Sequence, residues 1–206
     1  SICQLDAGNR QMTWLRGQLA SASKNGEKVY LAMHIPPGMD AHSGHPTWAN
    51  ISGQTPWLNQ FLGIVDSNQS TISGILYGHT HMDELRRLYN LSQTQITEIA
   101  ISAPGISPVD GNNPGFKLVY FDPASKELLD FVTCYTTPGS TVFGDASYRF
   151  SSTFGFQPGP GKFIADSLKN MPLQAIDQAM NTIYLVKRKT ASSKSTMSGI
   201  EVVPVQ

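Results

Sequence analysis

Charge, cysteine and long hydrophobic runs are all scarce in this chain of 206 residues. Charged side chains make up 15% of the sequence, and 15 basic residues balance 15 acidic ones, so no basic field favours a nucleic-acid polymer or an anionic membrane. Two cysteines, Cys3 and Cys134, define neither a disulfide framework nor a redox compartment. No apolar run approaches the roughly 20 residues that a transmembrane helix needs, so we expect no membrane-spanning segment.

The first residues carry neither an initiator methionine nor a signal peptide. Residues 1–6 resemble the end of a strand, and we therefore expect that the sequence begins inside a larger protein. The length is sufficient for a substantial hydrophobic core.

The first half of the chain alternates between helical and strand patterns. Apolar residues, with Trp14 among them, recur at helical spacing over residues 10–23, and Gly26 ends that predicted helix. Residues 29–33 predict a strand buried on both faces, Pro56 opens a second helix, and residues 72–77 predict another buried strand. This order indicates a layered α/β architecture.

Strand-like segments follow at residues 85–89, 96–101, 116–121 and 128–135, and their succession predicts an antiparallel section that completes a sheet. Beyond residue 136 the strand pattern fades, and short helices are expected at 162–170 and 173–187. We predict three regions: an α/β portion over residues 1–136, a helical extension over 137–189 and a tail over 190–206.

Three histidines stand where the two predicted buried strands end. His34 leaves the first strand, and the Gly78-His79-Thr80-His81 turn leaves the second. Ligands of α/β sheets bind at the carboxyl ends of strands, and neutral imidazole ligates zinc, iron, nickel and copper. His34, His79 and His81 are therefore predicted metal ligands; the alternative is three surface or capping histidines.

For four residues near these histidines, the sequence leaves two alternative roles open. His42 and His45 lie in a long loop rich in glycine and proline, where they either contact a substrate head group above the metal site or are simply solvated. Asp83 and Glu84 follow the histidine turn, and they either orient a ligating imidazole by accepting its N–H or lie on a solvated edge.

These stretches carry a resemblance to a known family. His34-Ile35-Pro36-Pro37-Gly38 and Gly78-His79-Thr80-His81-Met82-Asp83-Glu84, in that order, resemble the C-terminal part of calcineurin-like metallophosphoesterases, specifically the acid sphingomyelinase-like phosphodiesterases. The resemblance covers roughly residues 4–136. It implies the C-terminal part of a four-layer αββα sandwich, followed by a small C-terminal helical region.

The resemblance also implies a centre with two divalent metal ions, zinc first, with iron or manganese as alternatives. His34 and His79 would bind one ion and His81 the other. The family's remaining ligands belong to Asp-x-His, Gly-Asp-x-x-Asp and Gly-Asn-His motifs upstream, and no stretch ahead of His34 carries them; Gly8-Asn9 is followed by Arg10. The resemblance assigns no proton-transferring catalytic residue to this segment.

The missing carboxylates have a physical consequence. Two divalent cations about 3.5 Å apart repel by roughly 19 kcal/mol at an effective dielectric of about 20, and three neutral imidazoles offset none of this. We therefore predict that the segment alone is inactive and that an upstream part of the same protein supplies the carboxylates.

With that part present, the expected function is metal-dependent phosphodiester hydrolysis on a phospholipid or nucleotide. One alternative is a non-catalytic binding scaffold on the same fold, and another is a phosphomonoesterase or nucleotide phosphodiesterase. The resemblance alone implies a secreted, periplasmic or lysosome-like location.

Overall fold

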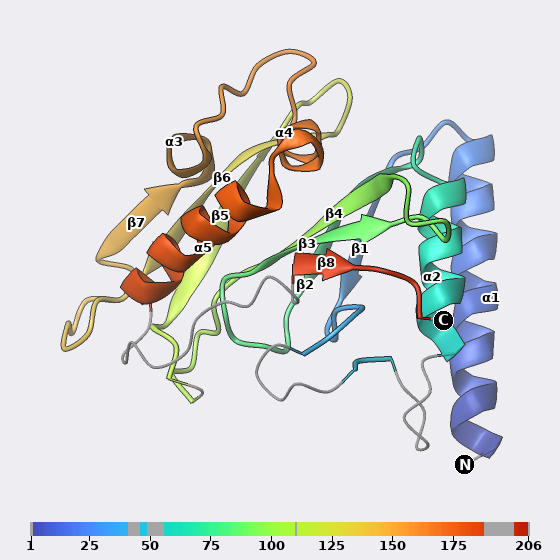
Figure 1. The fold of residues 1–206 in the computed structure, drawn as a ribbon, viewed down its shortest axis with the longest axis horizontal. Helices are drawn as coiled ribbons and strands as arrows, with labels where there is room; N and C mark the ends of the chain where they lie inside the picture. The colour runs from blue at the N-terminus through green and yellow to red at the C-terminus, as the bar shows by residue number, and fades with distance from the viewer. Residues whose placement is uncertain (1, 41–45, 49–55, 110, 188–199, 206) are drawn as a thin grey trace.

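The computed structural model describes residues 2–40, 46–48, 56–109, 111–187 and 200–205. Helices and two β-sheets are stacked in layers, with α1 and α2 at one side and the smaller sheet at the other (Figure 1). The predicted layered α/β class is confirmed, and the arrangement is consistent with part of a sandwich fold.

Helix α1 spans Ile2–Lys24, so the prediction of a strand end at the start of the chain is wrong. No proline interrupts this stretch, and Gly26 ends it with a left-handed φ of 69°. Trp14, one of the apolar residues at helical spacing, has a side chain that is 61% exposed. Met12 is buried instead, since with Leu19 it shares the apolar face at helical spacing.

The larger sheet has the strand order β1-β2-β4-β3-β8, with β1 at Val29–Met33, β2 at Ile72–Tyr77, β3 at Leu85–Tyr89, β4 at Ile96–Ser102 and β8 at Glu201–Val202. β1, β2 and β4 run parallel, and β3 is antiparallel to β4. β2 is largely buried, as predicted.

The prediction that residues 29–33 are buried on both faces is wrong. β1 ends the strand order of the larger sheet and pairs with β2 alone among the described residues. Leu31 is buried, whereas Tyr30 is 36% exposed. The apolar run therefore indicated a strand correctly but not its place at the edge.

Helices α1 and α2, the latter at Pro56–Ser67, cover one face of the larger sheet (Figure 1). Ala100 of β4 faces these helices, whereas its neighbours Ile99 and Ile101 face the second core, as strand alternation requires. The first core contains Met12, Leu19, Leu31, Leu58, Phe61, Leu62, Ile64, Val65, Ile72, Ile75, Tyr77, Leu88, Ala100 and Val202.

The smaller sheet has the order β5-β6-β7, with β5 at Gly115–Phe121, β6 at Leu128–Tyr135 and β7 at Ala146–Arg149. The expectation of one completed sheet is thus corrected, because β3 and β4 join the larger sheet while β5 and β6 open a second one. The sequence pattern also missed β7, whose four residues are too few to show an alternation.

Helices α3 at Phe150–Phe154, α4 at Ile164–Asn170 and α5 at Leu173–Lys187 follow the smaller sheet. α4 and α5 match the predicted terminal helices. The second core lies among these helices, β6 and the far face of the larger sheet, and it contains Leu85, Ile99, Ile101, Leu128, Phe131, Phe150, Phe154, Ile164, Leu168, Ile176, Met180 and Ile200.

The end of the segment assigned to the tail returns to the larger sheet. β8 pairs in parallel with β3, and both Ile200 and Val202 are buried. The Val205 N–H also donates to the Asn59 side chain on α2 at 2.9 Å. Within the described ranges, no helix has the length and apolar character needed to cross a membrane.

Candidate functional site

The parallel register of β1 and β2 brings His34 next to His79. Met33 and Tyr77 are direct partners at the carboxyl ends of these strands, and the Gly78 N–H donates to the His34 carbonyl at 3.0 Å. The two imidazole rings meet edge to face, with centroids 5.2 Å apart and planes at 79°. His34 and His79 are therefore close in space, and their binding of one shared metal ion stays a prediction.

The histidine turn is held in a strained backbone conformation. His79 and His81 have φ values of 75° and 57°, a region that non-glycine residues rarely occupy. Such conformations persist only where the surrounding structure determines them, and they cluster at functional sites. The strain supports a functional interpretation of this turn.

His81 lies on the other side of the turn, against the loop between β4 and β5. Its carbonyl accepts a hydrogen bond from the Gly105 N–H at 2.9 Å, and a Cβ at Gly105 would lie 3.0 Å from the Cβ and Cγ of His81. A larger residue than glycine at 105 would thus press on the His81 side chain.

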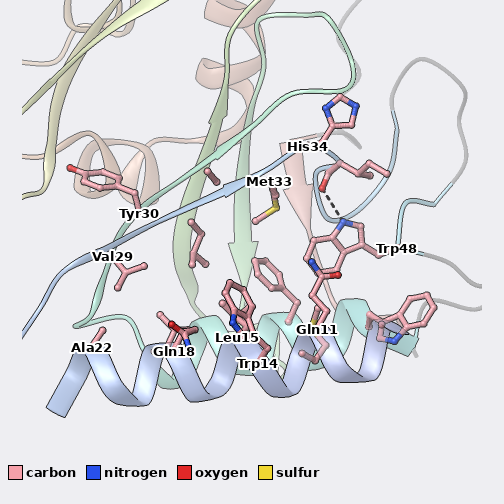
Figure 2. Close-up of a pocket in the computed structure, with 18 of the residues that line it drawn as sticks. Gln11, Trp14, Leu15, Gln18, Ala22, Val29, Tyr30, Met33, His34 and Trp48 are labelled. Carbon is pink, nitrogen blue, oxygen red and sulfur yellow. Dashed lines mark hydrogen bonds between the residues drawn. The ribbon is translucent and has the colours of Figure 1, made fainter. Parts of the chain in front are cut away.

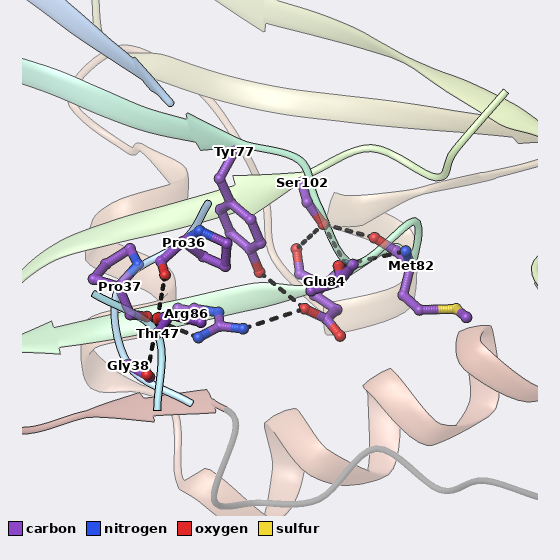
Figure 3. Close-up of polar contacts among 10 residues, drawn as sticks. Pro36, Pro37, Gly38, Thr47, Tyr77, Met82, Glu84, Arg86 and Ser102 are labelled. Atoms are coloured by element: carbon purple, nitrogen blue, oxygen red, sulfur yellow. Dashed lines mark hydrogen bonds and ion pairs between the residues drawn. The ribbon is translucent and has the colours of Figure 1, made fainter. Parts of the chain in front are cut away.

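The turn after His34 is fixed by two buried side chains (Figure 3). The Thr47 hydroxyl lies 2.5 Å from the Pro36 carbonyl and 2.9 Å from that of Gly38. The Arg86 guanidinium donates to the Pro37 carbonyl at 2.7 Å, and its residue is 1% exposed. Arg86 lies on β3, so it connects the His34 turn to the strand that follows His81.

Glu84 and Tyr77 complete this buried cluster. The Glu84 carboxylate is 3.6 Å from the Arg86 guanidinium and accepts from the Tyr77 hydroxyl at 3.5 Å. Burial raises the pKa of Glu84, and the Arg86 charge acts in the opposite direction. Burial, together with the Glu84 charge, also raises the pKa of Tyr77, which keeps its hydroxyl a donor. Glu84 therefore contacts Arg86 within the protein, and it does not lie on a solvated edge.

Asp83 is buried too, so the solvated-edge alternative is wrong for it as well. Its carboxylate lies 3.1 Å from the Lys117 ammonium and accepts from the Tyr148 hydroxyl at 2.5 Å. Burial lowers the pKa of Lys117 and the Asp83 charge raises it. Burial and Asp83 both raise the pKa of Tyr148. These partners come from the smaller sheet. An imidazole-orienting role for Asp83 stays a prediction.

The donor set fits part of a metal site. His34 and His79 are close enough for both imidazoles to face one ion, and neutral imidazole is a suitable ligand. Among the described residues, no group of three or more histidine, cysteine, aspartate or glutamate side chains lies close enough to hold a metal ion. That the carboxylates of a two-metal centre come from elsewhere in the protein stays a prediction.

The predicted substrate contacts His42 and His45 lie outside the described residues. A groove of about 1060 Å³ runs between α1 and β1, and Figure 2 shows His34 and Trp48 at one end of it. His79 and His81 do not line this groove, so it extends away from the histidine turn. Its walls are largely apolar, with Trp14, Leu15 and Tyr30 among them.

Sequence reasoning missed Arg86, Lys117 and Thr47 as residues that support the site. A signal was present for the first two, because each is a cation inside a strand-like segment whose other residues are mostly apolar. Strand alternation gives such a residue either a solvent-facing position or a buried partner. The partners, the Pro37 carbonyl and Asp83, are 49 and 34 residues away in sequence, which no local pattern reveals.

The fold defines a layered α/β protein that is consistent with part of a sandwich, and sequence comparison narrows the class of protein. The chain is similar to acid sphingomyelinase-like phosphodiesterases. Acid sphingomyelinase-like phosphodiesterase 3b of Mus musculus is 31% identical over 134 residues, which cover 61% of this chain and 28% of the relative. No family model matches the chain.

Two further relatives carry related names. Cyclic GMP-AMP phosphodiesterase SMPDL3A of Homo sapiens is 31% identical over 132 residues, covering 61% of this chain and 28% of the relative. Sphingomyelin phosphodiesterase of Bos taurus is 30% identical over 156 residues, covering 70% of this chain and 23% of the relative. The matched part of the chain thus spans less than a third of the length of these relatives, all of which are phosphodiesterases by name.

Proposed function

We propose that this chain is the C-terminal part of a metal-dependent phosphodiester hydrolase of the acid sphingomyelinase-like type. The observation that carries the proposal is the pair of turns at the ends of β1 and β2, which hold His34 and His79 with ring centroids 5.2 Å apart. The second of these turns is strained, with positive φ at His79 and His81. The similarity to phosphodiesterases from three mammals supports the same activity.

His34 and His79 would bind one divalent ion and His81 a second, with zinc as the first candidate and iron or manganese as alternatives. When bound, such ions polarise the phosphoryl oxygens and activate the nucleophile. The chain's own residues hold the imidazoles in place: Thr47 and Arg86 fix the His34 turn, and Gly105 supports the His81 backbone.

The remaining metal ligands would come from an upstream segment of the same protein. Two features of the described residues support this. β1 pairs on one side only and borders an apolar groove. β5 ends the order of the smaller sheet, and its Leu118, Tyr120 and Phe121 are 43–54% exposed. Open apolar strand edges are ordinarily covered or paired, and added strands would cover them. This segment alone is expected to be inactive.

The substrate class is a phosphodiester, either a phospholipid or a nucleotide, and a secreted or lysosome-like location belongs to the same proposal. Hydrolysis of sphingomyelin, a chromogenic phosphodiester and a cyclic dinucleotide by the full-length protein with zinc tests it. Turnover of at least one substrate, abolished by a chelator, is expected. Inactivity on all three with metal present would instead favour a binding scaffold on this fold, and turnover of a chromogenic phosphomonoester alone would favour a phosphomonoesterase.

A further inference from the structure

Asp83 stands between the histidine turn and β3, two residues after His81, and both of its carboxylate oxygens are bound from the smaller sheet. Lys117 of β5 lies 3.1 Å from Oδ1, and the Tyr148 hydroxyl of β7 donates to Oδ2 at 2.5 Å. The turn at residues 78–81 follows β2 of the larger sheet. The Asp83 carboxylate therefore connects the two sheets next to His79 and His81, the candidate metal ligands.

The Lys117 ammonium is enclosed by the smaller sheet on its other sides. It donates to the Thr133 hydroxyl at 2.7 Å and lies 3.6 Å from the centre of the Phe131 ring. The side chains of Lys117 and Asp83 are 4% and 2% exposed. All three strands of the smaller sheet, β5, β6 and β7, therefore supply a group to this cluster.

Stability alone is a weak reason to bury an ion pair. Removing two charges from water offsets most of their attraction, and apolar residues of similar volume often stabilise a core as well or better. A buried pair does fix geometry, because its short contacts allow few alternative arrangements. The strained φ values of His79 and His81 need such fixing from their surroundings.

Other anchors of the turn come from the end of β4 and the loop after it. The Ser102 hydroxyl donates to the Met82 carbonyl at 2.8 Å, and the Glu84 N–H donates to that hydroxyl at 2.9 Å. The Gly105 N–H donates to the His81 carbonyl. Asp83 adds an anchor on the opposite side, toward the smaller sheet.

We propose that Lys117, assisted by Tyr148, is a positioning residue that fixes the His79 and His81 turn through the Asp83 carboxylate. The importance of that turn rests on the proposed metal-dependent function, but the positioning itself does not. The two sheets thereby become coupled at the site, since a displacement of the smaller sheet would move the histidines.

The imidazole resonances of His79 and His81 test this in the metal-free full-length protein by nuclear magnetic resonance. Lys117→Met keeps the length of the side chain and removes its charge, whereas Lys162→Met makes the same change at an exposed lysine. We expect both imidazoles to shift in Lys117→Met and neither to shift in Lys162→Met. Tyr148→Phe, which removes one hydroxyl, should give smaller shifts in the same direction.

The double variant Asp83→Asn with Lys117→Met shows whether Lys117 acts through Asp83, when its imidazole shifts are compared with those of the two single variants. If Lys117 acts through Asp83, its removal adds little further shift once Asp83 is neutral, so the two changes are not additive. Unchanged His79 and His81 resonances in a folded Lys117→Met protein would overturn the proposal. If that variant does not fold, unchanged resonances in Tyr148→Phe would overturn it.

Zinc titration of the full-length protein separates this proposal from the proposed function. Loss of zinc affinity of about tenfold or more is expected for Lys117→Met, as for other groups that support metal ligands. A wild-type protein that binds no zinc would defeat the proposed function, while the resonance shifts would still decide whether Lys117 positions the turn.

Discussion

Two buried cations, Arg86 and Lys117, connect the turn after His34 and the turn at residues 78–81 to the rest of the protein. Arg86 and Lys117 are each almost inaccessible to solvent, and each contacts a group that is distant in sequence. Arg86 has the simpler environment, because its guanidinium donates to the Pro37 carbonyl and lies 5.3 Å from the Tyr77 ring centre. The Arg86 side chain therefore fixes the position of the turn after His34.

Replacing Arg86 should destabilise the protein substantially. Arg86→Met leaves the Pro37 carbonyl without this donor and Glu84 without its nearest cation. We expect the free energy of unfolding to fall by about 2–4 kcal/mol, as measured by urea denaturation. Arg16→Met, at an exposed site on α1, is the matched control and should change it by less than about 0.5 kcal/mol. Equal effects at the two positions would contradict the anchoring role.

At the scale of elements, the sequence predicted most helices and strands because their periodicity is local. The segments at 85–89, 96–101, 116–121 and 128–135 form β3 to β6 with boundaries that match within one residue. Assignment to two sheets could not be predicted, because strand pairing depends on contacts far apart in the chain. β8 was missed for the same reason: its two residues are ordered by β3.

The candidate site was predictable in part for a similar reason. His34 and His79 follow strands whose carboxyl ends meet, so their proximity follows from a parallel pair. The partners of Asp83 were not predictable, since Lys117 and Tyr148 reach it from another sheet. A carboxylate beside a polar turn resembles a solvated residue in sequence, and its burial depends on the tertiary fold.

Two glycines should respond to alanine in opposite directions. A Cβ at Gly115 on β5 would lie 2.5 Å from the Cys134 carbonyl oxygen of β6, and backbone cannot move aside cheaply. Gly115→Ala should therefore lower the free energy of unfolding by about 1–3 kcal/mol. Gly17→Ala, at an open position inside α1, should raise it by about 0.5–1 kcal/mol. Urea denaturation measures both, and a stabilising Gly115→Ala would refute the close β5–β6 approach.

At the scale of the whole molecule, stability should depend on the ionisation of Glu98. Burial raises the pKa of this β4 carboxyl from 4.5 to about 7, although a hydrogen bond from the Ile99 N–H and the Lys169 charge act against the rise. The folded state holds the Glu98 proton more tightly than the unfolded state does. The protonated carboxyl therefore contributes fully to the free energy of unfolding below about pH 4.5, and this contribution is lost as the pH rises through about 7.

Comparison of the wild type with Glu98→Gln isolates this contribution. The wild type should lose roughly 3 kcal/mol between pH 4.5 and pH 8 relative to the variant, as a shift of about 2.5 pKa units implies. Urea denaturation at several pH values measures the difference. Identical pH profiles for the two proteins would show that Glu98 does not carry the effect.

The central claim is that the histidine turns form part of a phosphodiesterase metal centre, and hydrolysis of a chromogenic phosphodiester by the full-length protein with zinc tests it most directly. His79→Ala should reduce the rate by at least about a hundredfold, because even residues that merely support metal ligands contribute 10–100-fold. Lys162→Ala, at an exposed site, should leave the rate unchanged. A His79→Ala protein that is folded and as active as the wild type would contradict the account.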